Sequence, residues 1–541
     1  MKKIIISVLA LFAFVANMIG QNLDPTVEVS RVYEGKLIEV HKPAIEMAVP
    51  DTLYKFDLDF DYWVFENPYK GSYEFKPYMM EMRPSSAQRH KNTFFLQAGA
   101  GYTLHPMLDL LWSPVKKGAF SMDVFATHRS YIGEYRALEQ IPAWDGYDLM
   151  SKAGLDFGYD WKKADFDFGA SYYGIADSDY RRKRAFNAAD AYASLRSKPS
   201  SPHAFIYDLG LNYKFADDGS DKLNEHDFSL DASLGARMHR GSKVLIDFGV
   251  GMDVYTGALS STASRFYIVP HYVFSKGRFD MDLGVRVSMI VASGDAFVTN
   301  GQVIYPDVRM NLALIPDAMK MYLNIGGGDK LQTYSSLIDK NHHLDLSYGV
   351  AGAGSLMGVT VERLSTVLGF EGRISSRFSY NLRGGYVNYK SAPLDAVGSA
   401  SCQYVPMLGY SPYQKAFAAL DWNLMCQDVR FNGTIVYNHA WGIKNVDFVG
   451  LSALEGDASF SYSWSSRINV GVDCNFATAR SSAAGFKVPG YADLGVYGEY
   501  ALNRKFSLWL RGGNLLNMEI QRNLLFAEKG INFTAGICLN L

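Results

Sequence analysis

The sequence predicts an all-β fold: a transmembrane antiparallel up-and-down β-barrel of about 22 strands with a short N-terminal periplasmic extension. Three observations lead to this prediction. Apolar and polar residues alternate with a period of two over most of residues 92–541, short and long connections separate the alternating segments, and the chain starts with a secretory signal.

Residues 1–20 predict the signal peptide. Lys2 and Lys3 precede an apolar segment at 4–16, and small and polar residues at 17–20 lead to a cleavage site before Gln21. The apolar segment is too short to cross a bilayer as a helix, and no later stretch approaches about 18 uncharged apolar residues. No cysteine follows it for a lipid anchor. We therefore expect an exported chain without a membrane helix.

Residues 21–91 predict a periplasmic extension rather than a simple linker. The segment is polar and rich in proline, but ten aromatic residues lie between Tyr54 and Tyr78. A free coil has no reason to carry so much apolar surface. We expect the segment to dock in the barrel lumen or on a periplasmic or lipoprotein partner.

Residues 92–541 predict the barrel, and the clearest strand is 278–289. Its apolar face consists of Phe279, Met281, Leu283, Val285, Val287 and Met289, and its other face of Asp280, Asp282, Gly284, Arg286 and Ser288. As a helix this segment would mix charged and apolar residues all round, so the strand is the better interpretation. The segment 243–255 repeats the pattern.

The connections predict two different barrel ends. Short polar turns are expected at 161–163, 240–242, 275–277, 375–377 and 465–467. Longer irregular loops are expected at 131–147, 176–185, 257–264, 293–302, 328–344 and 477–489. Periplasmic turns and external loops differ in this way in transmembrane barrels. Among the predicted strands, the alternation is weakest at 107–112 and 403–410.

A soluble sandwich or propeller would also alternate, with its apolar face turned inward. Three features favour lipid instead: the signal peptide, segments longer than ordinary soluble strands, and apolar faces that end in aromatic residues. Such ends are Tyr159/Trp161, Tyr213/Phe215 and Tyr462/Trp464. The last segment also alternates up to Leu541. We expect outer-membrane lipid to surround the barrel.

Residues 497–517, YGEYALNRKFSLWLRGGNLLN, resemble the penultimate strands of TonB-dependent receptors. The layout of residues 92–541 resembles the short, plug-less TonB-dependent-receptor-like barrels of Bacteroidota outer membranes, most specifically over 490–541. The resemblance implies outer-membrane localisation and a receptor or transport role. Thr26–Ser30 fits a loose TonB-box pattern, or is an extended segment that pairs with a partner or the barrel wall. TonB coupling stays open, because no plug-like sequence precedes the barrel.

The sequence predicts no enzyme, and we assign no catalytic, cofactor-binding or metal-binding residues. It lacks a G-x-S-x-G elbow, an H-E-x-x-H motif and a phosphate-binding loop. Lys+Arg 53 against Asp+Glu 55 leaves no basic footprint for nucleic acid. Cys474 and Cys538 are expected on opposite faces, which excludes a disulfide between them.

Two polar motifs are candidate binding sites. His342 and His343, flanked by Asp339 and Asp345, form a metal-like cluster; on a strand they would point to opposite faces, and we expect a solvated external loop. The basic stretch 181–184 is expected in an external loop, either solvated or bridging the phosphates of lipopolysaccharide.

Two functions follow from these observations. The first is an outer-membrane channel or receptor for a solute, with residues 22–91 narrowing the lumen from the periplasmic side. The second is a non-transporting scaffold that docks a periplasmic or lipoprotein partner through the same residues.

Overall fold

The structure is a computed structural model that describes residues 93–102, 104–115, 119–138, 141–198, 205–238, 242–293, 297–298, 303–316, 318–344, 346, 356–400 and 403–541. The predicted signal peptide at 1–20, the extension at 21–91 and the TonB-box-like Thr26–Ser30 lie outside the described residues.

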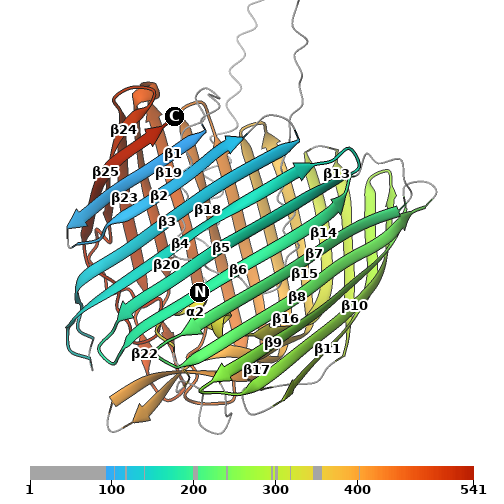
Figure 1. The fold of residues 1–541 in the computed structure, drawn as a ribbon, viewed down its shortest axis with the longest axis horizontal. Helices are drawn as coiled ribbons and strands as arrows, with labels where there is room; N and C mark the ends of the chain where they lie inside the picture. The colour runs from blue at the N-terminus through green and yellow to red at the C-terminus, as the bar shows by residue number, and fades with distance from the viewer. Residues whose placement is uncertain are drawn as a thin grey trace, which may run out of the picture. The chain divides into compact units, whose positions relative to one another are not determined.

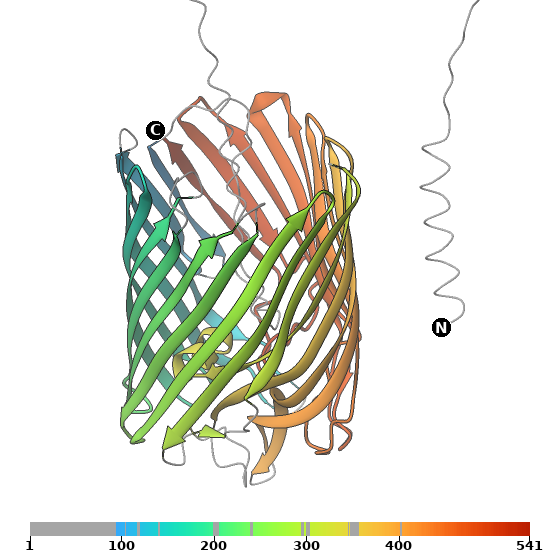
Figure 2. The ribbon, with the colours of Figure 1, turned by 90° about the vertical axis from the view of Figure 1, so that its right-hand side faces the viewer.

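The wall of the molecule is a closed antiparallel β-barrel (Figures 1 and 2). Each wall strand pairs with its neighbours in sequence, and β1 (Phe94–Tyr102) pairs with β25 (Asn532–Asn540) to complete the ring. The sheet has 23 strands; without β12 (Phe297–Val298), a two-residue strand parallel to β15, 22 strands form the wall. This confirms the predicted strand number and the up-and-down topology.

The wall strands between β1 and β25 have the following bounds: β2 (Met107–Val115), β3 (Phe120–Tyr135), β4 (Trp144–Asp160), β5 (Ala164–Ser178), β6 (Lys183–Ser197), β7 (Phe205–Asp218), β8 (Leu223–Arg237), β9 (Lys243–Gly257), β10 (Ser261–Lys276), β11 (Phe279–Ser293), β13 (Ile304–Ile315), β14 (Met319–Gln332), β15 (Met357–Ser375), β16 (Phe378–Ala400), β17 (Gln403–Met425), β18 (Val429–Trp441), β19 (Leu454–Trp464), β20 (Ile468–Ala477), β23 (Tyr491–Ala501) and β24 (Phe506–Gly513). A separate hairpin pairs β21 (Arg480–Ser481) with β22 (Lys487–Val488).

The outer surface of the barrel is apolar. In β9 the side chains of Val244, Ile246, Val250 and Met252 are 40–47% exposed. Asp253, on the other face of the same strand, is buried. Because the apolar residues are the exposed ones, the alternation serves a lipid-facing wall rather than a dry core. Among the described residues, no helix is both long and apolar enough to cross a bilayer.

The short-turn end agrees with the sequence analysis. Turns join the strands at 161–163 and 376–377, and a 3-10 turn, η3 (Ser465–Arg467), joins β19 to β20. At the turn between β10 and β11, Gly277 has a φ of 62°, a conformation that glycine adopts without steric cost. The chain enters β1 and leaves β25 at this end.

At the other end the strands run farther than predicted. Residues 131–147 and 176–185 are not long loops: β3 to β6 include most of them and leave only 136–143 and 179–182 as connections. Residues 403–410 are the outer part of β17 rather than a strand of their own, whereas 107–112 lie in β2 as predicted. The outer ends of β3 to β6 and of β17 pair with their neighbours but lack an apolar residue at every second position. The alternation in the sequence therefore ends before the strands do.

The predicted loop at 328–344 contains the end of β14 and a short helix, α2 (Tyr334–Lys340). Thr333 caps the helix by accepting a hydrogen bond from the Ser336 N–H. Seven residues are too few for a stable helix in water, and too few for a helical pattern in the sequence. Burial of Tyr334, Leu337 and Ile338 therefore supplies the stability of α2.

Two adjacent residues of β7 test which face of the wall meets lipid. Leu211 is 43% exposed on the outer face, and Asn212 follows it on the inner face. We expect Leu211→Arg to lower the free energy of unfolding in detergent or lipid by about 2–4 kcal/mol, because a cation would enter the hydrocarbon layer. Asn212→Arg, the matched control, should cost less than about 1 kcal/mol. Urea titrations followed by heat-modifiable gel migration measure both, and equal effects would contradict the lipid-facing assignment.

Candidate functional site

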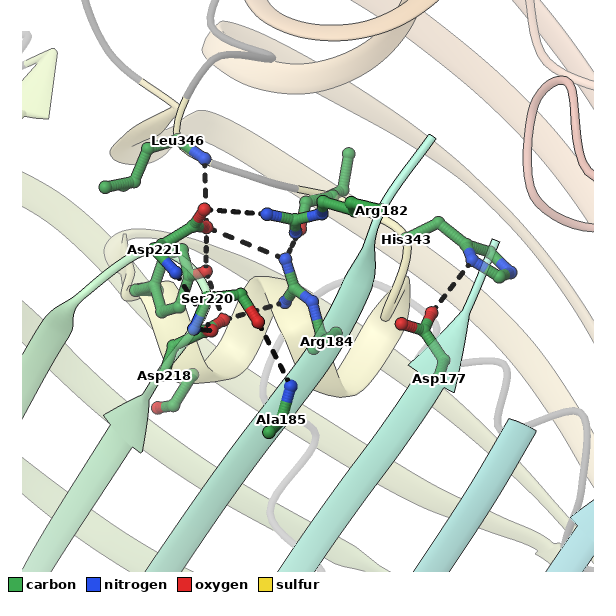
Figure 3. Close-up of polar contacts among 12 residues, drawn as sticks. Asp177, Arg182, Arg184, Ala185, Asp218, Ser220, Asp221, His343 and Leu346 are labelled. Atoms are coloured by element: carbon green, nitrogen blue, oxygen red, sulfur yellow. Dashed lines mark hydrogen bonds and ion pairs between the residues drawn. The ribbon is translucent and has the colours of Figure 1, made fainter. Parts of the chain in front are cut away.

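The candidate site is the mouth of the barrel at the long-loop end, where the connection between β14 and β15 folds inward. We call residues 333–344 and 346 of this connection the mouth loop. It contacts the rim of β4 to β8, although β9, β10, β11 and β13 separate β8 from β14 in the wall (Figure 3). The mouth loop therefore reaches across the inside of the barrel rather than extending outward.

Two arginines fasten the mouth loop to the rim: Arg184 of β6, which is buried, and Arg182 of the preceding turn, which is partly exposed. The Arg184 side chain has no exposed surface, and its guanidinium lies 3.2 Å from Asp218 Oδ2 and 3.6 Å from Asp221 Oδ2. Arg182 pairs with Asp221 at 2.7 Å. Both arginines also donate to the Leu344 carbonyl oxygen (Figure 3). The ion pairs thus hold backbone of the mouth loop as well as the rim.

This arrangement corrects the expectation for Arg182 and Arg184, whereas Arg181 and Lys183 are exposed, as expected for a solvated stretch. The stretch does lie at the loop end, but Arg184 is buried and Arg182 is directed to the mouth loop. These two side chains are neither solvated nor placed to bridge lipopolysaccharide phosphates. Their acceptors, Asp218, Asp221 and Leu344, are distant in sequence, which explains why the stretch looked like an unpaired basic patch.

The start of α2 is fixed by carboxylates from the β7–β8 rim. The Tyr334 hydroxyl donates to Asp218 Oδ2 at 2.7 Å and also to Asp221. The Ser335 N–H and hydroxyl donate to the two oxygens of Glu225 at 2.8 and 2.7 Å. Burial and the adjacent carboxylates raise the pKa of Tyr334 well above its usual value, so the hydroxyl remains a donor.

The two adjacent histidines follow α2 in a turn. The His343 N–H donates to Asn341 Oδ1 at 3.0 Å. His342 Nε2 lies 3.1 Å from Asp148 Oδ2, and His343 Nδ1 lies 3.2 Å from Asp177 Oδ2. The expectation of a solvated loop is therefore wrong, because the mouth loop carries both side chains into the barrel, where they are 12% and 10% exposed.

The acidic partners of the histidines are not those suggested by the sequence. Asp345 lies outside the described residues, and Asp339 interacts with Tyr173 instead. Asp148 and Asp177 come from the outer ends of β4 and β5, where they are register partners. Only the closed barrel brings these strands to the mouth loop, so no local pattern pointed to them.

The two histidines titrate differently. Burial lowers the pKa of both imidazoles, but at His342 the interaction with Asp148 and the charges of Asp177 and Asp179 together outweigh burial and raise the pKa to about 9. At His343 burial and the neighbouring cationic His342 together lower the pKa. The two neighbouring imidazoles therefore lose their protons at different pH, His342 at a higher pH than His343.

A second group of loops packs over the mouth. A hydrophobic core joins side chains from β3–β4, β16, β18–β19, β22 and β24–β25: Ile141, Val397, Val449, Val488, Leu524 and Leu525. From the β24–β25 loop, Phe526 stacks on the His343 ring at 3.8 Å between centroids. Because β3 and β16 lie far apart in the wall, these loops meet over the lumen and not along one side of it.

The lumen wall below the mouth is polar. Arg265 pairs with Asp227 at 3.2 Å, and the Tyr267 hydroxyl donates to Asp231 at 2.6 Å. These residues alternate with the exposed apolar side chains of the outer face. In β20 the side chain of Val472 faces outward. Cys474 lies two positions later and therefore also faces outward, as predicted.

Comparisons with known proteins identify the barrel type. No protein-family model matches the sequence, and no curated protein matches it significantly. Among solved structures, a mutant of the ferric enterobactin receptor PfeA of Pseudomonas aeruginosa has a TM-score of 0.58 at 9% identity, covering 83% of this chain and 80% of that one. The siderophore receptor PirA of Acinetobacter baumannii gives 0.59 at 10%, and the copper transporter OprC 0.62 at 10%, with the same coverage of both chains.

These neighbours share the fold of this chain, a closed 22-strand barrel of the kind found in TonB-dependent receptors. Two of them are receptors and the third is a copper transporter. At 9–10% identity the comparison shows the barrel fold alone. The role of the mouth loop has to be argued from its own residues.

Two arginines of β6 test the role of the buried ion pairs. Arg184→Ala leaves Asp218 buried without its cation, while Asp221 keeps Arg182, and should weaken docking of the mouth loop by about 3–5 kcal/mol. Arg196→Ala removes an exposed pair with Asp208 and should cost less than about 1 kcal/mol. Hydrogen–deuterium exchange of residues 333–344 is the measurement. Unchanged protection in Arg184→Ala would show that other contacts hold the loop.

Proposed function

We propose that this protein is an outer-membrane receptor or transport barrel for a solute, exported by the signal at 1–20. The observation that carries the proposal is a lipid-facing barrel with a polar lumen whose mouth is covered by its own packed loops. The receptors and transporter that share the fold support it. The layout resembles plug-less barrels of Bacteroidota, and we extend that assignment to this chain.

The covered mouth gives the proposal a mechanism. Ion pairs of Arg184 and Arg182 and the hydrogen bonds of Tyr334 hold the mouth loop over the lumen. A solute that entered from the loop end would have to displace these contacts or pass between them. The resting barrel is therefore a closed or narrow path, and opening requires the mouth loop to move.

We assign the other end of the path to residues 21–91. Their aromatic residues supply apolar surface that would bind in the lumen or on a periplasmic or lipoprotein partner. Thr26–Ser30 is the segment through which TonB would act, if TonB energises the barrel. Outer-membrane lipid surrounds the wall in either case.

Planar-bilayer recordings test closure at the two ends separately. We expect deletion of residues 22–90 to raise single-channel conductance, and replacement of residues 333–346 by a short Gly-Ser linker to raise it as well. The double variant should conduct most, because both constrictions are gone. The matched control is Arg196→Ala, which leaves the mouth contacts intact. Currents that stay at the wild-type level in all variants would refute a closed transport path.

Fractionation tests the location independently of conductance. The mature protein should remain with the outer membrane and show heat-modifiable gel migration, as closed barrels do. A protein that stays in solution without detergent would contradict the proposed location.

A further inference from the structure

The mouth loop and the β4–β5 rim bring together a set of side chains that the proposed transport role does not use. Asp177, His342 and His343 each present a ligand atom, and these atoms all lie within 4.8 Å of one another. Asp148 lies beside Asp177 and pairs with His342. Two imidazoles and a carboxylate form a ligand set that Zn²⁺ and similar ions prefer.

The polar atoms of this set are buried but poorly satisfied. His342 Nε2, His343 Nδ1, Asp177 Oδ2 and Asp148 Oδ1 have almost no accessible surface and make no hydrogen bond. The two imidazole–carboxylate contacts are at ion-pair distance, 3.1 and 3.2 Å. Buried polar atoms in native proteins are normally bonded, so Asp177 Oδ2 and His343 Nδ1, which face each other at 3.2 Å, indicate a missing group that they would bind.

The local geometry favours a shared ion. A turn rather than a strand holds the histidines, so their rings lie on the same side, with centroids 4.2 Å apart. Phe526 stacks on His343 with an interplanar angle of 7°, which fixes that ring and shields the cluster. Figure 3 shows the imidazole of His343 directed at the Asp177 carboxylate.

We infer that Asp177, His342 and His343 bind a divalent first-row transition-metal ion, with Zn²⁺ as the best match. Ligands about 2 Å from a tetrahedral ion are roughly 3.3 Å from one another, so the atoms need only small side-chain adjustments. Asp148 contacts His342 Nε2, so His342 would bind the ion through Nδ1 while Asp148 orients the ring from outside the ligand set, as carboxylates do beside metal-bound imidazoles. The ion cross-links the mouth loop to β5 and so fastens the loop that covers the lumen.

Zinc titration of the full mature chain in detergent tests the site. The protein carries no histidine tag, is stripped with a chelator and is titrated with ZnCl₂ in a calorimeter. We expect one equivalent to bind saturably. His343→Ala should abolish this binding, and Asp148→Asn should weaken it about 10–100-fold. Mg²⁺ should give no comparable heat, because it prefers oxygen ligands.

The lumen offers a matched control. His271 also lies between two carboxylates, Asp247 and Asp282, at 3.3 and 2.8 Å, but it has no second histidine. His271→Ala should leave the zinc equivalent unchanged. Heat-modifiable migration verifies that each variant is folded, and the near-isosteric Asp177→Asn replaces His343→Ala if the latter does not fold.

Hydrogen–deuterium exchange provides the second measurement. Zn²⁺ should slow exchange of residues 334–344 in the wild type and not in Asp177→Asn. No saturable zinc binding in the wild type, or binding unchanged in both His343→Ala and Asp177→Asn, would overturn the inference and leave two simple ion pairs. The inference does not rest on transport, because an ion can fasten the mouth loop of a barrel that conducts nothing.

Discussion

The constraint on which this structure depends is that a backbone in hydrocarbon must satisfy its own hydrogen bonds. An open sheet would leave one row of N–H and C=O groups at each edge. Pairing of β1 with β25, from Phe95 opposite Asn540 to Tyr102 opposite Phe533, removes both edges. Closure then fixes the rest, because one face of the wall points outward and exposes apolar side chains while the other encloses a lumen.

The lumen creates a second requirement, because a wide barrel leaves space that its wall side chains do not fill. In this protein the loops turn inward and bring charge with them. Arg184, Asp218 and Asp221 are removed from water, and the desolvation of such groups offsets much of their attraction. These ion pairs contribute to the position of the mouth loop more than to stability, because the guanidinium and the carboxylates leave the loop few alternative places to bind. A seven-residue helix that is unstable alone becomes a fixed part of the barrel.

The wall could be predicted from the sequence because each strand carries its own local pattern. Residues 278–289 alternate over their whole length, and β11 covers 279–289 with Leu283, Val285 and Met289 exposed on the predicted apolar face. The alternation did not predict the strand ends within 176–185. There β5 and β6 extend beyond the apolar band of the outer face, so they no longer need an apolar residue at every second position. The alternation failed more completely at His342 and His343, whose partners Asp148 and Asp177 lie more than 160 residues earlier in the chain. Contacts across a lumen leave no periodic pattern.

The difference between the wall and the mouth also explains how this chain can have the same barrel fold as PfeA and OprC at about 10% identity. A lipid-facing wall requires an apolar side chain at alternate positions and accepts many residues there, so the fold survives almost complete replacement of its sequence. The mouth is different, since Arg184 requires carboxylates at 218 and 221, and Tyr334 and Ser335 require acceptors at 218 and 225. These side chains depend on one another's charge and hydrogen-bonding groups, so a change to one removes a contact from a buried neighbour. The wall therefore identifies the fold. The features that distinguish this protein from other barrels lie among the residues that close its mouth.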